Sequence, residues 1–119
     1  MLKFHKIEEV MIAELIDETF IISHTQEVLD LIGEAGFVNC NRIILYERNL
    51  HPDFFRLQTR LAGDILQKFS NYRWKLAIIG DFSNFKSKSL QDFIRECNRG
   101  NRIFFTESFE DAIRKLTGK

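Results

Sequence analysis

The segment from Arg42 to Leu116 alternates short apolar runs with longer amphipathic ones, and this alternation limits the fold more than any other feature of the chain. The short runs are too brief for helices and are rich in β-forming residues. The longer runs repeat apolar residues every three or four positions, as crossover helices between parallel strands do. The sequence therefore predicts an α/β fold with a mainly parallel sheet, whose strands include residues 42–46, 75–79 and 102–105.

The rest of the chain supplies further elements of the same kind. Two apolar runs at residues 10–13 and 20–22 predict two strands separated by a turn. Helix starts are predicted from capping patterns and from a proline that suits a first helical position. These starts lie at Ser23, Pro52, Ser89 and Ser108, and the second helix is expected to reach Tyr72. The expected architecture is one domain, residues 1–119, with about five strands and four helices.

Charge and composition exclude several classes of protein. Seventeen basic residues balance seventeen acidic ones. The chain therefore lacks the net positive charge that attracts nucleic acid or anionic membranes, and neither is an expected partner. No apolar run reaches membrane-spanning length and the first ten residues do not resemble a signal peptide, so a cytoplasmic location is expected. Cys40 and Cys97 have no metal-ligand spacing, and the sequence predicts no metal and no cofactor.

The predicted strands are apolar on both sides, which raises a question about the second face of the sheet. Successive right-handed crossovers between neighbouring strands place their helices on one face. A second apolar face is then either covered by helices divided between both faces or exposed as a surface for a homodimer or another protein. The residues predicted for this interface are Ile21, Ile44, Tyr46, Ile79 and Phe104.

Two resemblances follow from the order of elements and from local motifs. The predicted order, the loop after residues 75–80 and the terminal segment 105–112 resemble the STAS domain of anti-sigma factor antagonists over almost the whole chain. The segments 53–55, 61–69, 76–82 and 87–90 resemble a family of small bacterial proteins known only as a domain of unknown function. The first resemblance implies a STAS-like fold, and the second implies no activity.

The STAS resemblance also bears on function. Antagonists of that family are switched by phosphorylation of a serine at a helix start, and the matching positions here hold Arg56 and Leu57, which accept no phosphate. What the resemblance implies is a non-enzymatic regulatory module that docks other proteins, in bacterial signalling or stress regulation. The loop before Pro52 and the turns after it form the expected contact surface.

Polar residues gather at two of the predicted strand ends. His51, Asp53, Arg56 and Arg60 surround the predicted start of the second helix, where free N–H groups favour an anion or an acidic partner. Asp81 and Ser83 follow the strand 75–79, at the edge where α/β sheets bind ligands. The sequence contains no arrangement of a nucleophile with a base and no phosphate-binding glycine loop, so no catalytic residue is predicted. The alternatives to docking are a small-ligand or nucleotide sensor that uses the loops around His51 and Asp81, and a small hydrolase or transferase whose site needs residues from two subunits.

Overall fold

A computed structural model describes residues 1–118 as one α/β unit built on a five-stranded sheet. The strand order is β1-β2-β3-β4-β5, in which β1 pairs antiparallel with β2 and all other pairs are parallel. The strands are β1 (Leu2–Ile7), β2 (Val10–Leu15), β3 (Arg42–Tyr46), β4 (Lys75–Ile79) and β5 (Ile103–Thr106). The helices are α1 (Thr25–Gly36), α2 (Leu61–Asn71), α3 (Lys88–Arg99) and α4 (Phe109–Thr117). The predicted α/β class, mainly parallel sheet and four helices are confirmed.

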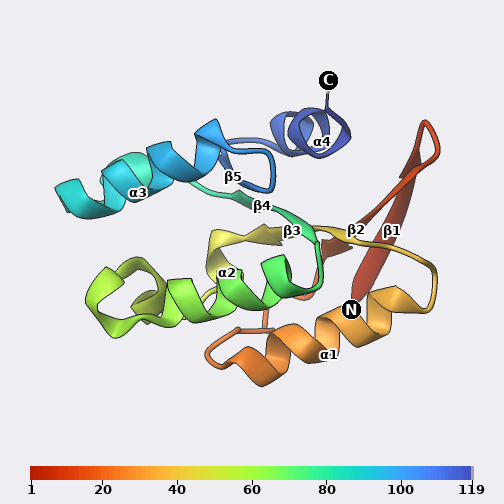
Figure 1. The fold of residues 1–119 in the computed structure, drawn as a ribbon, viewed down its shortest axis with the longest axis horizontal. Helices are drawn as coiled ribbons and strands as arrows, with labels where there is room; N and C mark the ends of the chain where they lie inside the picture. The colour runs from red at the N-terminus through yellow and green to blue at the C-terminus, as the bar shows by residue number, and fades with distance from the viewer. Residues whose placement is uncertain (119) are drawn as a thin grey trace.

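The helices divide between the two faces of the sheet (Figure 1). Helices α1, α2 and α3 cover one face, where Ile43, Leu45 and Leu76 join the larger of two apolar clusters. Helix α4 covers the other face and buries Ala112 and Leu116 in the smaller cluster. Of the two arrangements that the sequence allowed, the sheet covered on both sides is the one observed.

This arrangement removes part of the predicted interface from the surface. Ile44 is 0 % exposed and Phe104 is 5 % exposed, because α4 packs over β4 and β5 and closes the second face. Both residues are core. The prediction that they form an exposed interface is wrong for this reason. Ile79, 9 % exposed, is buried in the same cluster, and it lies with Ile21 and Tyr46 at the end of the sheet described below.

The predicted strand at residues 10–13 is confirmed as β2, but β1 and the segment 20–22 differ from the prediction. Strand β1, which was not predicted, forms a hairpin with β2 through a two-residue turn at Glu8 and Glu9. Both turn residues have positive φ, 49° and 71°, as such turns require, but neither is the glycine or asparagine that normally signals one. The predicted strand at residues 20–22 is instead a loop whose Ile22 makes one isolated bridge to Leu50.

The second helix begins nine residues later than predicted. Pro52 starts a short 3₁₀ turn, η2 (Pro52–Phe55), which is followed by η3 (Leu57–Thr59) before α2 begins at Leu61. The Thr59 hydroxyl donates to the carbonyl oxygens of Asp53 and Arg56. These bonds compete with the backbone hydrogen bonds that a continuous α-helix would need here. Arg60 then adopts a left-handed conformation, with φ 67°, and turns the chain into α2.

The other helix starts follow local capping chemistry. Ser108 caps α4 as predicted, because its hydroxyl accepts from the Asp111 N–H. Helix α3 is capped by Ser87 rather than Ser89, and α1 begins after His24, one residue beyond Ser23. None of the helices within residues 1–118 has the length and apolar character needed to cross a membrane.

Candidate functional site

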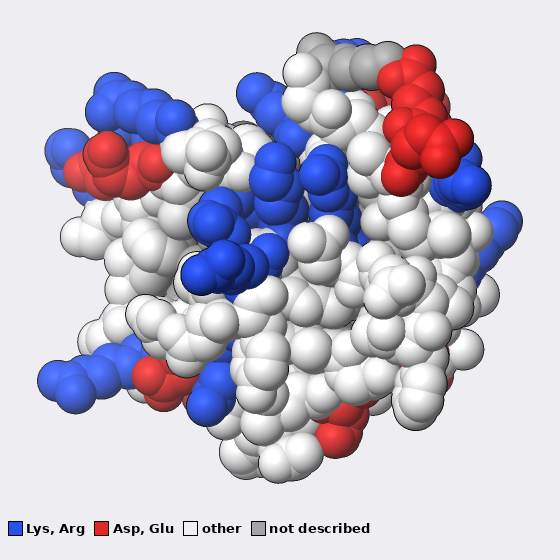
Figure 2. Space-filling model, turned by 45° about the vertical axis from the view of Figure 1, so that its right-hand side comes forward, with Lys and Arg blue, Asp and Glu red and all other residues white. Residues whose placement is uncertain are grey.

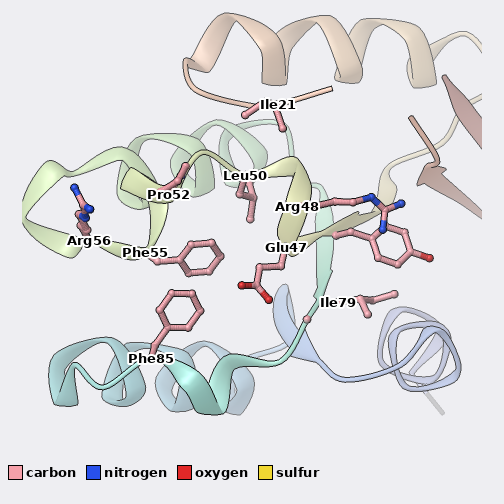
Figure 3. Close-up of a pocket in the computed structure, with 11 residues that line it drawn as sticks. Ile21, Glu47, Arg48, Leu50, Pro52, Phe55, Arg56, Ile79 and Phe85 are labelled. Carbon is pink, nitrogen blue, oxygen red and sulfur yellow. The ribbon is translucent and has the colours of Figure 1, made fainter. Parts of the chain in front are cut away.

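A hollow of about 970 Å³ opens at the carboxyl ends of β3 and β4 (Figure 3). Parallel sheets of α/β proteins commonly bind ligands at this edge. Its lining comes from four segments that are distant in sequence: the loop before α1, the turns after β3, the end of β4 and the loop before α3. The lining residues are Ile21, Tyr46, Glu47, Arg48, Leu50, Pro52, Phe55, Arg56, Ile79, Gly80 and Phe85.

Glu47 places a carboxylate inside this mostly apolar hollow. Its side chain points toward the centre, between the two phenylalanines and Ile79 (Figure 3). One oxygen, Oε1, accepts a hydrogen bond from the Asp81 N–H at 3.3 Å. No Lys, Arg or His within residues 1–118 forms an ion pair with it. The two guanidiniums of the lining are directed elsewhere, Arg48 to the Tyr46 ring and Arg56 to Asp53, so the Glu47 carboxylate has no ion pair within residues 1–118.

Gly80 makes this position of Glu47 possible. A Cβ atom at residue 80 would lie 2.6 Å from Glu47 Oε1 and 2.8 Å from Glu47 Cβ. The second contact cannot be relieved by rotating the carboxylate, because that Cβ is fixed to the backbone. Glycine at the end of β4 is thus the residue that allows η1 (Glu47–Asn49) to pack against this strand.

Two aromatic rings close one end of the hollow. Phe55 from η2 and Phe85 from the loop before α3 stack with centroids 4.7 Å apart and planes at 18°. Phe55 also lies against Phe54 and Phe82, which belong to the larger core cluster. The stack joins two chain segments and gives the hollow a firm apolar wall.

The opposite end is formed by Tyr46 and Arg48. The Arg48 guanidinium lies over the tyrosine ring, with Cζ 4.3 Å from the centroid. The Tyr46 hydroxyl donates to Glu14 Oε2 at 2.6 Å, and Glu14 Oε1 lies 2.9 Å from His5 Nε2. Burial and this neighbouring carboxylate raise the pKa of Tyr46 to about 12, so its hydroxyl remains protonated near neutral pH.

The loop that carries Ile21 is fixed by a buried asparagine. The Asn49 amide nitrogen donates to the carbonyl oxygens of Asp17 and Phe20, each at 3.0 Å. Its amide oxygen accepts from the Tyr46 N–H at 3.0 Å, and the side chain is fully buried. Asn49 therefore holds the rim at Ile21 against the end of β3 and preserves the shape of the hollow.

The predicted site residues around Pro52 come together, but not at a helix start. His51 Nδ1 accepts from the Asp53 N–H at 3.0 Å and so caps η2. Asp53 lies 3.6 Å from the Arg56 guanidinium, and Arg56 reaches the hollow. The predicted anion site at the start of a long helix is wrong, because η2 is a four-residue 3₁₀ turn. Arg60 lies beyond η3, at the start of α2.

The other predicted pair caps a turn on the far side of the hollow. The Asp81 carboxylate accepts from the Ser83 hydroxyl at 2.6 Å and from the Ser83 N–H at 3.2 Å. The hydroxyl contact is the main cause that lowers the pKa of Asp81, with the backbone contact second. Both side chains are used within this turn and neither lines the hollow.

Sequence reasoning did not assign Glu47, Arg48 or Phe55 to a site. In the sequence, Phe55 is one of the apolar residues of a predicted helix, and Glu47 is a polar residue that follows a predicted strand. No local motif marks either residue. The usable signal was topological. Glu47 and Phe55 both lie between β3 and α2, and the carboxyl ends of β3 and β4 meet at one edge of the sheet.

Comparison with known families identifies the chain. Residues 7–116 match the model of DUF4180, described as a domain of unknown function, and the chain belongs to this family. The predicted membership of a family without assigned activity is thereby confirmed. Neither the curated proteins nor the solved structures contain a match to the chain. Within residues 1–118, no group of three or more His, Cys, Asp or Glu side chains is arranged to hold a metal ion.

Proposed function

We propose that the protein is a ligand-binding module of STAS-like fold that takes up a small, largely apolar molecule in the hollow beyond β3 and β4. The order of elements, two strands followed by a helix and then three strand–helix pairs, is the order on which the STAS resemblance rests. Of the two predicted non-enzymatic roles, sensor and docking module, the sensor has the stronger support. The site differs from the predicted one, since Glu47 and the aromatic wall replace His51 and Asp81 as its main features.

The observation that supports this proposal is Glu47 among apolar neighbours. Glu47 is half-buried, and a carboxylate that loses part of its contact with water is stabilised by a hydrogen bond or by a cation. Oε1 has a backbone N–H donor, and the carboxylate forms no ion pair with the residues that the structure describes. A ligand with an ammonium group would supply this cation, and an aromatic ring on the same ligand would pack against Phe55 and Phe85.

Binding rather than catalysis is proposed because of the chemistry of the lining. The described lining residues include no Ser, Thr, Cys, Lys or His, and Glu47 is the only carboxylate among them, so the lining offers neither a nucleophile with a base nor a pair of acids. The Tyr46 hydroxyl is directed to Glu14 and has a raised pKa, so it is poorly suited to act as a base.

Three probes of similar size and different charge test the proposal: 2-phenylethylamine, 2-phenylethanol and phenylacetate. The amine should raise the melting temperature by several degrees at a concentration well above its Kd, since binding at about 100 Kd adds ~2.7 kcal/mol. The alcohol should act weakly and the carboxylate not at all. Glu47→Gln should abolish the shift, whereas the matched control Glu110→Gln, an exposed acid on α4, should preserve it. An equal response to all three probes, or none to any, would contradict the proposal.

Docking of a partner protein is the second candidate, and one observation favours it. Ile21, on the rim of the hollow, is 40 % exposed and extends the apolar lining to the surface. A partner with an apolar side chain beside a lysine or arginine would use the same wall and the same Glu47 carboxylate. Charge reversal at Asp53 and Arg56 should then abolish partner binding without a change in thermal stability, while the amine probe would still bind.

A further inference from the structure

The opposite edge of the sheet, where β3, β4 and β5 begin, has a concentration of positive charge. Arg42 is paired in register with Lys75, and Arg102 lies beside Lys75 because its carbonyl accepts from the Leu76 N–H at 2.8 Å. Each of these residues directly precedes one whose side chain packs in the larger cluster, namely Ile43, Leu76 or Ile103. Side chains alternate along a strand, so Arg42 in β3 and Lys75 in β4 face the side covered by α4, while Arg102 directly precedes β5.

Helix α4 adds further basic residues above this row. Lys115 lies over the Phe104 ring at 5.9 Å, and Arg114 projects from the same turn. Together they border a second hollow of about 290 Å³. Its lining residues are Lys75, Gly100, Asn101, Phe104, Arg114, Lys115 and Gly118. Figure 2, which turns this side of the molecule forward, shows a group of blue side chains together near the middle of the view.

The charges of this group are largely unneutralised. Among residues 1–118, Arg114 pairs with Asp111 at 2.6 Å, but Lys75, Arg102 and Lys115 have no acidic partner within 4 Å. The carboxyl end of α4 contributes about half a negative charge through its dipole. The Arg42 guanidinium donates to the Leu116 carbonyl and offsets that end of the helix. Lys75 and Lys115, the cations of the lining that form no ion pair within residues 1–118, exceed what remains of the dipole, so the hollow favours an anion.

We propose that this hollow binds a small molecule that carries a phosphate group. Lysine and arginine side chains are the usual phosphate ligands, and Gly100 and Gly118 let an anion approach the backbone closely. Phe104 provides an apolar floor for a ring attached to the phosphate. The hollow is small, about 290 Å³, so it suits a compact ligand of the size of a mononucleotide and not an extended chain. This site is separate from the hollow at the other edge and does not depend on the function proposed for it.

AMP and adenosine are the probes that test the phosphate requirement. The full chain is titrated with each at constant ionic strength, and ¹H–¹⁵N correlation spectra report the amides of Gly100, Asn101 and Gly118. AMP should shift these three signals while adenosine leaves them unchanged. Inorganic phosphate should shift them in the same direction with weaker affinity. Equal shifts with adenosine, or shifts confined to Gly80 at the other edge, would overturn the proposal.

Charge-removing variants test the assigned residues. Lys75→Gln and Lys115→Gln should each weaken AMP binding about fivefold, the effect of one partly exposed charge pair. The matched control Lys86→Gln, exposed in the loop before α3, should leave the affinity unchanged. If Lys75→Gln alters the melting temperature, Lys115→Gln on the helix surface provides the decisive comparison. Equal weakening by the control, or displacement of AMP by duplex DNA at micromolar concentration, would overturn the assignment to a small phosphorylated ligand.

Discussion

Replacement of Asn49 by alanine should destabilise the protein by about 3 kcal/mol, a large effect for one polar side chain. Its amide makes three hydrogen bonds at 3.0 Å to the backbone of Asp17, Phe20 and Tyr46. Each such bond contributes ~1 kcal/mol net, and the cost rises where a backbone group is left buried without a partner. Because Asn49 is fully buried, water does not replace the lost amide without rearrangement of the loop.

Urea denaturation followed by the fluorescence of Trp74 measures this change. Trp74 is the only tryptophan and is 4 % exposed, so its emission reports global unfolding. With a denaturant slope of ~1.5 kcal/mol/M, the midpoint of Asn49→Ala should fall by about 2 M. The control Asn84→Ala removes an exposed contact of 3.3 Å to Asp81 and should cost less than ~0.5 kcal/mol. If the two variants unfold at the same midpoint, the three bonds of Asn49 do not hold the loop as argued.

Two further predictions concern the second sheet face and the first helix. Ile44→Ala should lower the free energy of unfolding by about 2–5 kcal/mol, because α4 buries the side chain. The control Ile21→Ala should lower it by less than ~1 kcal/mol. If Ile44→Ala instead changes the molar mass in light scattering without loss of stability, Ile44 belongs to an interface. Burial raises the pKa of Glu27, but the Ser23 and His24 N–H donors together outweigh it and hold that pKa below 4.5. The stabilisation from Glu27 is therefore present at neutral pH and lost as pH falls through the folded-state pKa. Glu27→Gln should cost ~0.5–1 kcal/mol at pH 7, and urea midpoints that stay apart at pH 3 would contradict this.

The parts of the fold that could be predicted are those where one local signal is sufficient. Strands β3 and β4 are continuous apolar runs because both faces are covered, and their predicted bounds match the structure. Strand β1 was missed because its turn uses two glutamates in a conformation that normally selects glycine or asparagine. Helix α2 was extended too far because the apolar spacing continues through η2 and η3, where the Thr59 hydroxyl and Arg60 break the helix.

The site at the carboxyl edge could be predicted only in part, for a related reason. Tyr46, Ile79 and Ile21 were selected as apolar residues of an exposed face, and they do lie together, but as the lining of a hollow. The Glu47 carboxylate can occupy its position only because residue 80 is glycine. Gly80 is 33 positions away in the sequence and next to Glu47 in space. Such a contact has no signature in a window of adjacent residues. It follows from the parallel pairing of β3 with β4, which brings the two strand ends to one edge.

A net charge of zero does not exclude a local excess of positive charge such as that around the second hollow. Equal numbers of acidic and basic residues argue against a field around the whole molecule, and that argument is sound beyond a Debye length of about 10 Å. It says nothing about separation of charge within that distance. Arg42, Lys75 and Arg102 each stand at the first position of an apolar run, a regularity visible in the sequence. Once those runs are interpreted as neighbouring parallel strands, their starts must lie side by side at one edge of the sheet. The local excess of charge was therefore accessible to sequence reasoning, through strand register rather than through composition.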